Sequence, residues 1–182
     1  MKVLSYLGPK ILSALKKRNQ RRLRKLNDQV LKEAALEYNL IDFNLAVFSY
    51  VFSKIVSKPR YLKSQYNPWL NNIEKAFEKI LREAPSKDEK LVMRLFSELE
   101  KKISALEDED PRFILGLVKK GKLKMAATFY AQGMSLGVAS DMTKLEKQEI
   151  LDYAGQTMMF DRLKEEKSIS ERMKIARSFI SG

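Results

Sequence analysis

Apolar residues in this chain recur at steps of three and four, and this spacing constrains the fold more than any other feature. The clearest series is Leu91, Leu95, Leu99, Ile103 and Leu106. Such steps place about one apolar side chain per turn on a single face of a helix. The alternation of apolar and polar residues that is typical of a strand does not persist anywhere. The chain is therefore predicted to be all-α.

The length and composition favour one compact domain of about seven to eight helices. The chain has 182 residues, 45% of them apolar, with seven Gly and five Pro, so long helices with short connections are expected. The predicted helices cover residues 9–39, 42–57, 67–84, 86–106, 111–120, 122–133, 143–154 and a stretch after 168. We expect residues 1–40 to form a basic helical segment, partly independent of a helical core at residues 41–182.

Local signals predict where these helices begin and end. Gly8-Pro9 suggests a break before a long amphipathic helix, in whose apolar stripe Asn19 fills a gap. Asp42 and Asn67 are residue types that cap helix N-termini, and Ser86 with Glu89 has the spacing of a capping box. Lys120-Gly121 has the pattern of a helix C-terminus. The segments 42–57, apolar nearly all round, and 122–138 are predicted to lie near the centre of the domain.

The absence of Cys and His limits the chemistry that this chain can perform. Without them there is no disulfide, no thiolate nucleophile and no Ser-His-Asp triad, and the commonest zinc ligands are missing. Glu146, Glu149 and Asp152 recur at steps of three and are the one candidate group for a hard metal ion. Metal-bundle sites of this kind usually include His. We therefore predict a protein that is not an enzyme and carries no cofactor or metal.

Positive charge is concentrated near the start of the chain. The net charge is +12, and residues 1–63 hold 14 Lys/Arg against 4 Asp/Glu. Seven of the cations lie within residues 16–25, which read KKRNQRRLRK and include no acid. Within this basic run only the C-terminal edge is close enough in sequence to pair with an acid, Asp28 or Glu33. A surface of this kind suits a polyanion or an acidic protein.

Two clusters form the candidate nucleic-acid-binding site. Lysine and arginine side chains make salt-sensitive contacts with phosphates, and exposed aromatic rings stack on unpaired bases. The basic run contributes Lys16, Lys17, Arg18, Arg21, Arg22, Arg24 and Lys25. The connection after residue 57, where cations and aromatic residues alternate, contributes Lys58, Arg60, Tyr61 and Lys63, together with Lys54 just before it. The leading hypothesis is sequence-independent binding of nucleic acid, with RNA or single strands favoured over duplex DNA.

Three further expectations remain open at this point. Lys119, Lys120, Lys122 and Lys124 surround a predicted turn and form a weaker candidate anion site. The basic helix could instead dock on an acidic protein, which would make the chain an interaction or assembly subunit. Residues 1–25, an apolar start followed by cations, could lie on an anionic membrane surface. With no secretory signal and no membrane span in the sequence, the expected location is the cytoplasm.

Overall fold

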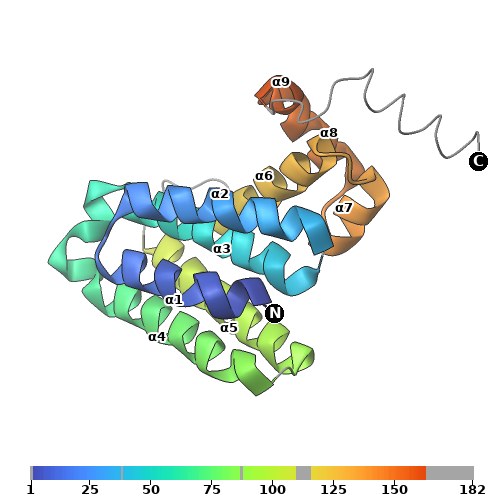
Figure 1. The fold of residues 1–182 in the computed structure, drawn as a ribbon. Coiled ribbons are helices and arrows are strands. Elements are labelled where there is room, and N and C mark those ends of the chain that lie inside the picture. Colours follow the sequence, from blue (N-terminus) through green and yellow to red (C-terminus); the bar gives the residue numbers. More distant parts are fainter. Residues whose placement is uncertain (1, 38, 87, 110–115, 163–182) are drawn as a thin grey trace, which may run out of the picture.

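The computed structural model describes residues 2–37, 39–86, 88–109 and 116–162, and over those residues it contains helices and no strand. The all-α prediction is confirmed, with eight helices of eight residues or more in the described part (Figure 1). The α-helices are α1 (Lys2–Lys16), α2 (Gln20–Glu37), α3 (Leu40–Val56), α4 (Asn67–Glu83), α5 (Glu89–Asp108), α6 (Leu117–Ala131), α7 (Leu136–Thr143), α8 (Lys147–Gln156) and α9 (Met159–Arg162). Short 3₁₀ helices are η1 (Pro59–Leu62), η2 (Ser64–Tyr66) and η3 (Ala84–Ser86).

Helix α3 lies at the centre, as predicted for residues 42–57. It packs against α1, α2, α5 and α6, while α4 packs against α1 and α5, and α6 carries α7, α8 and α9. Three phenylalanines of α3 each meet a phenylalanine of another helix: Phe43 with Phe129 of α6, Phe48 with Phe96 of α5, and Phe52 with Phe77 of α4. These aromatic contacts thus join α3 to α4, α5 and α6.

Two glycines predicted to interrupt helices instead allow helices to approach closely. Gly8 lies inside α1, where an added Cβ would come within 2.3 Å of Leu81 Cδ2 near the end of α4. Gly121 lies inside α6, where a Cβ would lie 3.0 Å from Val51 Cγ2 on α3. The predicted break at Gly8-Pro9 and the predicted helix end at Lys120-Gly121 are therefore wrong. Because glycine has no Cβ, it allows two helices to pack closely as well as allowing a turn.

The single helix predicted for residues 9–39 is two helices joined by a turn at residues 17–19. The Arg18 N–H donates to Leu15 O and the Asn19 N–H to Ala14 O, both at 2.9 Å, and Arg18 takes a left-handed φ of 53°. This is the Schellman pattern of a helix end. Asn19 then caps α2, because its Oδ1 accepts a hydrogen bond from the Arg22 N–H at 2.9 Å. The residue that was expected to continue a helix begins a new one.

Several predicted caps are also displaced by a few residues. Asn39, not Asp42, caps α3, and Asp88, not Ser86, caps α5 through the Leu91 N–H. Asn67 is the first residue of α4, which follows directly on η2. The start predicted for a helix at residue 111 and the helix expected after residue 168 lie outside the described residues.

Most apolar side chains of α1 belong to the protein core. Val3, Leu4, Leu7, Ile11 and Leu15 are all buried in the same cluster as the apolar residues of α3. This burial covers most of the apolar residues that had suggested contact with a membrane surface, whereas Tyr6 is exposed. Among the described helices, none combines the length and the apolar character needed to cross a bilayer.

Candidate functional site

Two of the seven cations in the basic run are paired with acids of α4. Lys16 Nζ lies 3.5 Å from Glu78 Oε1 in an exposed contact. Arg18 forms a closer ion pair with Glu74, in which both side chains are largely buried, and also donates to Leu15 O at 2.8 Å. Neither of these acids is near the run in sequence, since α4 supplies partners more than fifty residues away. Arg18 is thus a structural residue of the turn at residues 17–19.

The other five cations of the run, Lys17, Arg21, Arg22, Arg24 and Lys25, meet no acid. Over the described residues, no carboxylate lies within ion-pair distance of any of these side chains, and all five are exposed. Helix α1 contains no acidic residue, and the first acid of α2 is Asp28. This end of the molecule therefore carries uncompensated positive charge.

The helical repeat distributes the four cations of the basic run that lie on α2 around the exposed side of this helix. Leu23, Leu26 and Asn27 are buried against the core. At about 100° per residue, Arg21 and Lys25 then lie opposite the buried residues, on the crest of the helix. Arg22 and Arg24 lie on the two flanks, Arg22 towards α1 and Arg24 towards α3. We call Arg21 and Lys25 the crest of α2.

On the α3 flank of α2, the three basic clusters of the sequence meet around one tyrosine. Tyr50 of α3 has Lys54 Nζ 5.3 Å and Lys124 Nζ 4.4 Å from its ring centroid. Arg24 lies close enough for its charge to act on the Tyr50 phenol. We call these four residues the Tyr50 cluster. They come from α2, α3 and α6, so cations separated by a hundred residues in sequence share one surface.

The surroundings of Tyr50 determine how its phenol titrates. Partial burial raises the pKa of Tyr50, Tyr153 raises it further, and Arg24 lowers it, with a net value of about 12. The ammonium groups over the ring gain a cation–π attraction of about 0.5–1 kcal/mol each where they are exposed. Tyr50 stays neutral at physiological pH and offers a partly exposed ring among cations.

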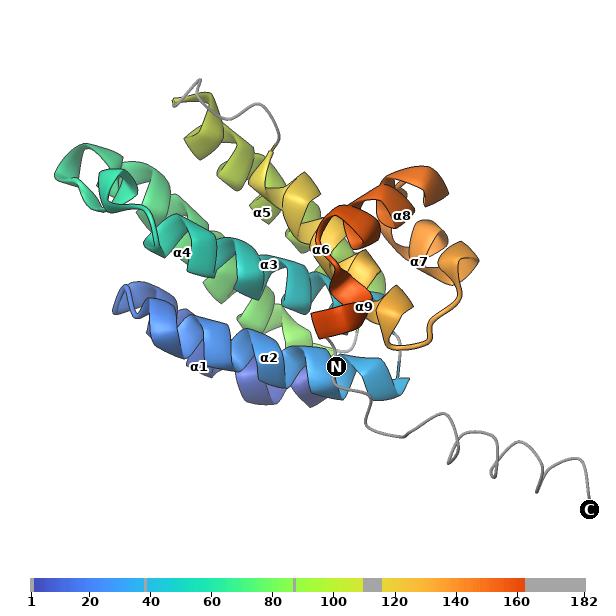
Figure 2. The same ribbon diagram turned by 90° about the horizontal axis from the view of Figure 1, so that it is seen from above.

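The second predicted cluster lies at the same end of the helix bundle as the turn at residues 17–19. Figures 1 and 2 both place the connection between α3 and α4 beside the α1–α2 end. Tyr61, however, is fully buried and packs edge-on against Tyr66, with ring centroids 5.4 Å apart. Lys58 and Arg60 lie over its ring at 5.9 and 5.1 Å. Tyr61 is thus a packing residue and cannot stack on a base, whereas Lys63 is exposed.

The third basic cluster lies within α6, not at a turn between helices. Lys119 pairs with Glu149 of α8 at 2.7 Å, and Lys122 pairs with Glu100 of α5 at 2.9 Å. The hydrogen bond from Lys119 is the main reason why the pKa of Glu149 is lowered. Two of the four lysines therefore join helices, and Lys124 belongs to the Tyr50 cluster.

The predicted carboxylate group does not assemble into a metal site. Glu149 is engaged by Lys119, and Asp152 accepts a hydrogen bond from Gln148 Nε2 at 2.7 Å. Within the part of the chain that the structure describes, no three acidic side chains converge as metal ligands.

Sequence reasoning missed Tyr50 because it counted this residue among the core side chains of α3. The signal that could have found it is the spacing of Tyr50 and Lys54, one helical turn apart on one face. The chain matches no protein-family model, no curated protein and no solved structure. The candidate site is therefore described from the structure alone. The protein is all-α, and the cationic helix α2 is flanked by the Tyr50 cluster.

Proposed function

We propose that the protein binds nucleic acid without catalysing a reaction, with RNA or single-stranded DNA preferred to duplex. The observation that carries this proposal is the set of exposed cations on α2 that meet no acid in the described structure and continue into the Tyr50 cluster. Side chains on such a surface neutralise phosphates and release counterions, which gives affinity without sequence preference.

The composition of the surface supports a polynucleotide over a simple anion. Three of the four cations that the basic run places on α2 are arginines, Arg21, Arg22 and Arg24, whose planar groups grip phosphate through two hydrogen bonds and stack on bases. Tyr50 adds a partly exposed ring beside them. Cations that follow the backbone together with a ring that meets a base are the usual means of holding single strands.

The proposal is tested by the salt dependence of binding to a labelled single-stranded oligonucleotide. If Lys17, Arg21, Arg22, Arg24 and Lys25 each meet one phosphate, the slope of log K against log salt is about −3.5, at roughly 0.7 per contact. Replacing the crest (Arg21→Ala with Lys25→Ala) should reduce the slope by about 1.4. The matched control removes two exposed charges from α5 (Lys101→Ala with Lys102→Ala) and should leave the slope unchanged.

Two results would overturn the proposal. One is the absence of binding at low ionic strength, and the other is an equal loss in the crest and control variants. A preparation at low salt whose absorbance at 260 nm shows no nucleic acid, but which retains a stoichiometric acidic protein, would favour docking on that protein instead.

A further inference from the structure

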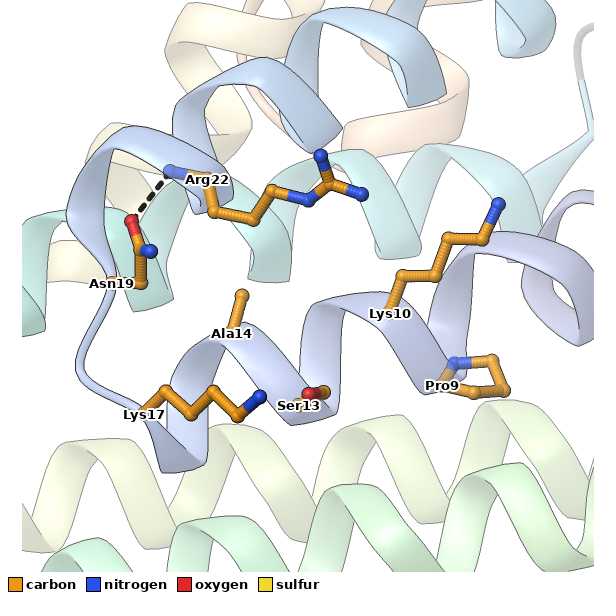
Figure 3. A pocket seen from close by; sticks show the side chains of 7 residues that line it. All are labelled: Pro9, Lys10, Ser13, Ala14, Lys17, Asn19 and Arg22. Atoms are coloured by element: carbon orange, nitrogen blue, oxygen red, sulfur yellow. Dashed lines mark hydrogen bonds between the residues drawn. The ribbon is translucent and has the colours of Figure 1, made fainter.

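A cavity of about 480 Å³ opens on the other flank of α2, between this helix and α1. Seven residues line it: Pro9, Lys10, Ser13, Ala14, Lys17, Asn19 and Arg22 (Figure 3). Three of the seven are cations and none is acidic. The volume falls in the range of about 300–1,000 Å³ that is usual for small-molecule sites.

The three cations line the cavity from three separate positions, one on α1, one in the turn at residues 17–19 and one on α2. Figure 3 shows the Arg22 guanidinium extending from α2 towards the side of Lys10, and the Lys17 ammonium lying along α1 towards Ser13. Lys10 Nζ is held over the Tyr6 ring, 3.5 Å from its centroid. The acids of α4 that pair with the basic run, Glu74 and Glu78, are engaged by Arg18 and Lys16 and do not line the cavity.

The attraction for an anion comes from these side chains and not from the helix terminus. The Arg22 N–H, at the start of α2, already donates to Asn19 Oδ1. Ser13 adds a hydroxyl that can donate to a phosphate oxygen, and Asn19 adds an amide. Pro9 and Ala14 add apolar surface, which suits a sugar or another small organic body and not a bare ion.

We propose that this cavity binds a phosphate monoester, with Lys10, Lys17 and Arg22 around the phosphate and its organic body against Pro9 and Ala14. A monoester carries about −1.5 to −2 charges at neutral pH, against −1 for a phosphodiester, so a trio of cations favours it. This inference shares Lys17 and Arg22 with the phosphate contacts proposed above, but the crest and the Tyr50 cluster do not line the cavity, so variants of the crest and of the cavity distinguish the two proposals. The monoester is either a free small molecule or the terminal phosphate of a strand.

Isothermal titration of the full chain with adenosine 5′-monophosphate tests the proposal, with adenosine as the uncharged comparison. The nucleotide should bind and adenosine should not. Lys17→Gln with Arg22→Gln should weaken binding at least about tenfold, the effect of losing one charged hydrogen bond. The crest pair, Arg21→Gln with Lys25→Gln, removes the same charge outside the cavity and should change affinity less than about twofold, since exposed charges there are screened.

A variant that fills the cavity without removing a charge tests whether nucleotide binding requires the open cavity as well as the cations. Ser13 is exposed on α1, so Ser13→Phe places a ring in the cavity while every cation remains. It should abolish nucleotide binding and leave the salt slope for an oligonucleotide unchanged. Circular dichroism and the unfolding midpoint confirm that each variant is folded.

Oligonucleotides with a 5′-phosphate or a 5′-hydroxyl distinguish the two sources of the monoester. Tighter binding of the phosphorylated strand, lost in Ser13→Phe, assigns the cavity to strand ends. Equal binding of both strands, with the nucleotide still bound, assigns it to a free small molecule. The proposal is overturned if millimolar nucleotide does not bind, if adenosine binds equally well, or if the crest variant loses as much affinity as the cavity variant.

Discussion

Replacing Gly121 by alanine should destabilise the protein, although alanine is the better helix former. Gly121 lies inside α6 and faces α3, where an added Cβ would lie 3.0 Å from Val51 Cγ2 and 3.2 Å from Val47 Cγ1. Both valines are fully buried, and β-branched side chains in helices have one strongly preferred rotamer. The two helices must therefore separate slightly to admit the methyl group.

The expected size of the effect follows from two opposing terms. Glycine to alanine in a helix interior stabilises by about 1 kcal/mol. Overpacking of a well-filled core costs about 1–3 kcal/mol. We expect a net loss of about 1 kcal/mol, because neither valine can rotate away. The control is Gly155→Ala in α8, where nothing lies within 4 Å of the added Cβ, so a gain of up to about 1 kcal/mol is expected there.

Urea unfolding followed by circular dichroism measures both variants. With a slope of about 2 kcal/mol per molar urea, the midpoint of Gly121→Ala should fall by about 0.5 M and that of Gly155→Ala should rise. Since Lys124 follows Gly121 by one turn of α6, the separation should also move Lys124 away from Tyr50. A Gly121→Ala protein as stable as the wild type, or more stable, would refute the close-packing argument.

Three further predictions concern a buried hydrogen bond, a left-handed residue and the Tyr50 phenol. Asn27→Ala should cost about 2 kcal/mol in urea unfolding, because buried Asn27 donates to Ala46 O and Ser49 Oγ, each at 2.8 Å; exposed Asn72→Ala is the control, and equal losses would contradict the argument. Lys144→Gly should raise the free energy of unfolding by about 1 kcal/mol, since Lys144 has a φ of 58°, whereas Lys102→Gly inside α5 should lower that free energy by a similar amount. The pKa of Tyr50 is raised from 10.0 to about 12, so the stability that its neutral phenol contributes is fully present below pH 10.0 and is lost as the pH rises through about 12. The tyrosinate absorbance of wild type minus Tyr50→Phe should titrate near that higher value, and a midpoint near 10 would contradict the assigned environment.

The fold class and the central helix could be predicted from sequence because both depend on a repeating pattern. The series from Leu91 to Leu106 indicates one apolar helix face, independent of the elements that pack against it. Helix α3 is apolar on nearly every side, which indicates a central position. Helix ends are harder to predict, because they depend on single residues that can have more than one structural role. Gly8 and Gly121 have the residue type of a break, yet both serve the close approach of another helix.

The turn at residues 17–19 could not be predicted because its residues resemble those of a helix. Arg18 takes the left-handed conformation that a glycine usually adopts at a helix end. Because the residue here is arginine, the sequence does not indicate that the helix ends. The one signal was the gap between Leu15 and Leu23, with Asn19, a preferred cap residue, at its middle.

The charges of the candidate site could be predicted, but their partners could not. The seven cations of the basic run are evident in the sequence, whereas the ion pairs of Lys16 and Arg18 reach α4. The burial of Tyr61 and the partial exposure of Tyr50 likewise depend on how helices pack, and a local pattern does not contain that information.

The placement of Arg22 and Arg24 on opposite flanks of α2 has a mechanical consequence for any polymer that binds there. A chain that touches both must cross the ridge of one helix, about 10 Å wide with its side chains, and turn down on each side. Duplex DNA is stiff over about 50 nm and would lie along the crest as a rod that reaches one flank only. A single strand bends freely within that distance. The stiffness of the polymer, independent of its bases, thus decides how many of these arginines it can engage.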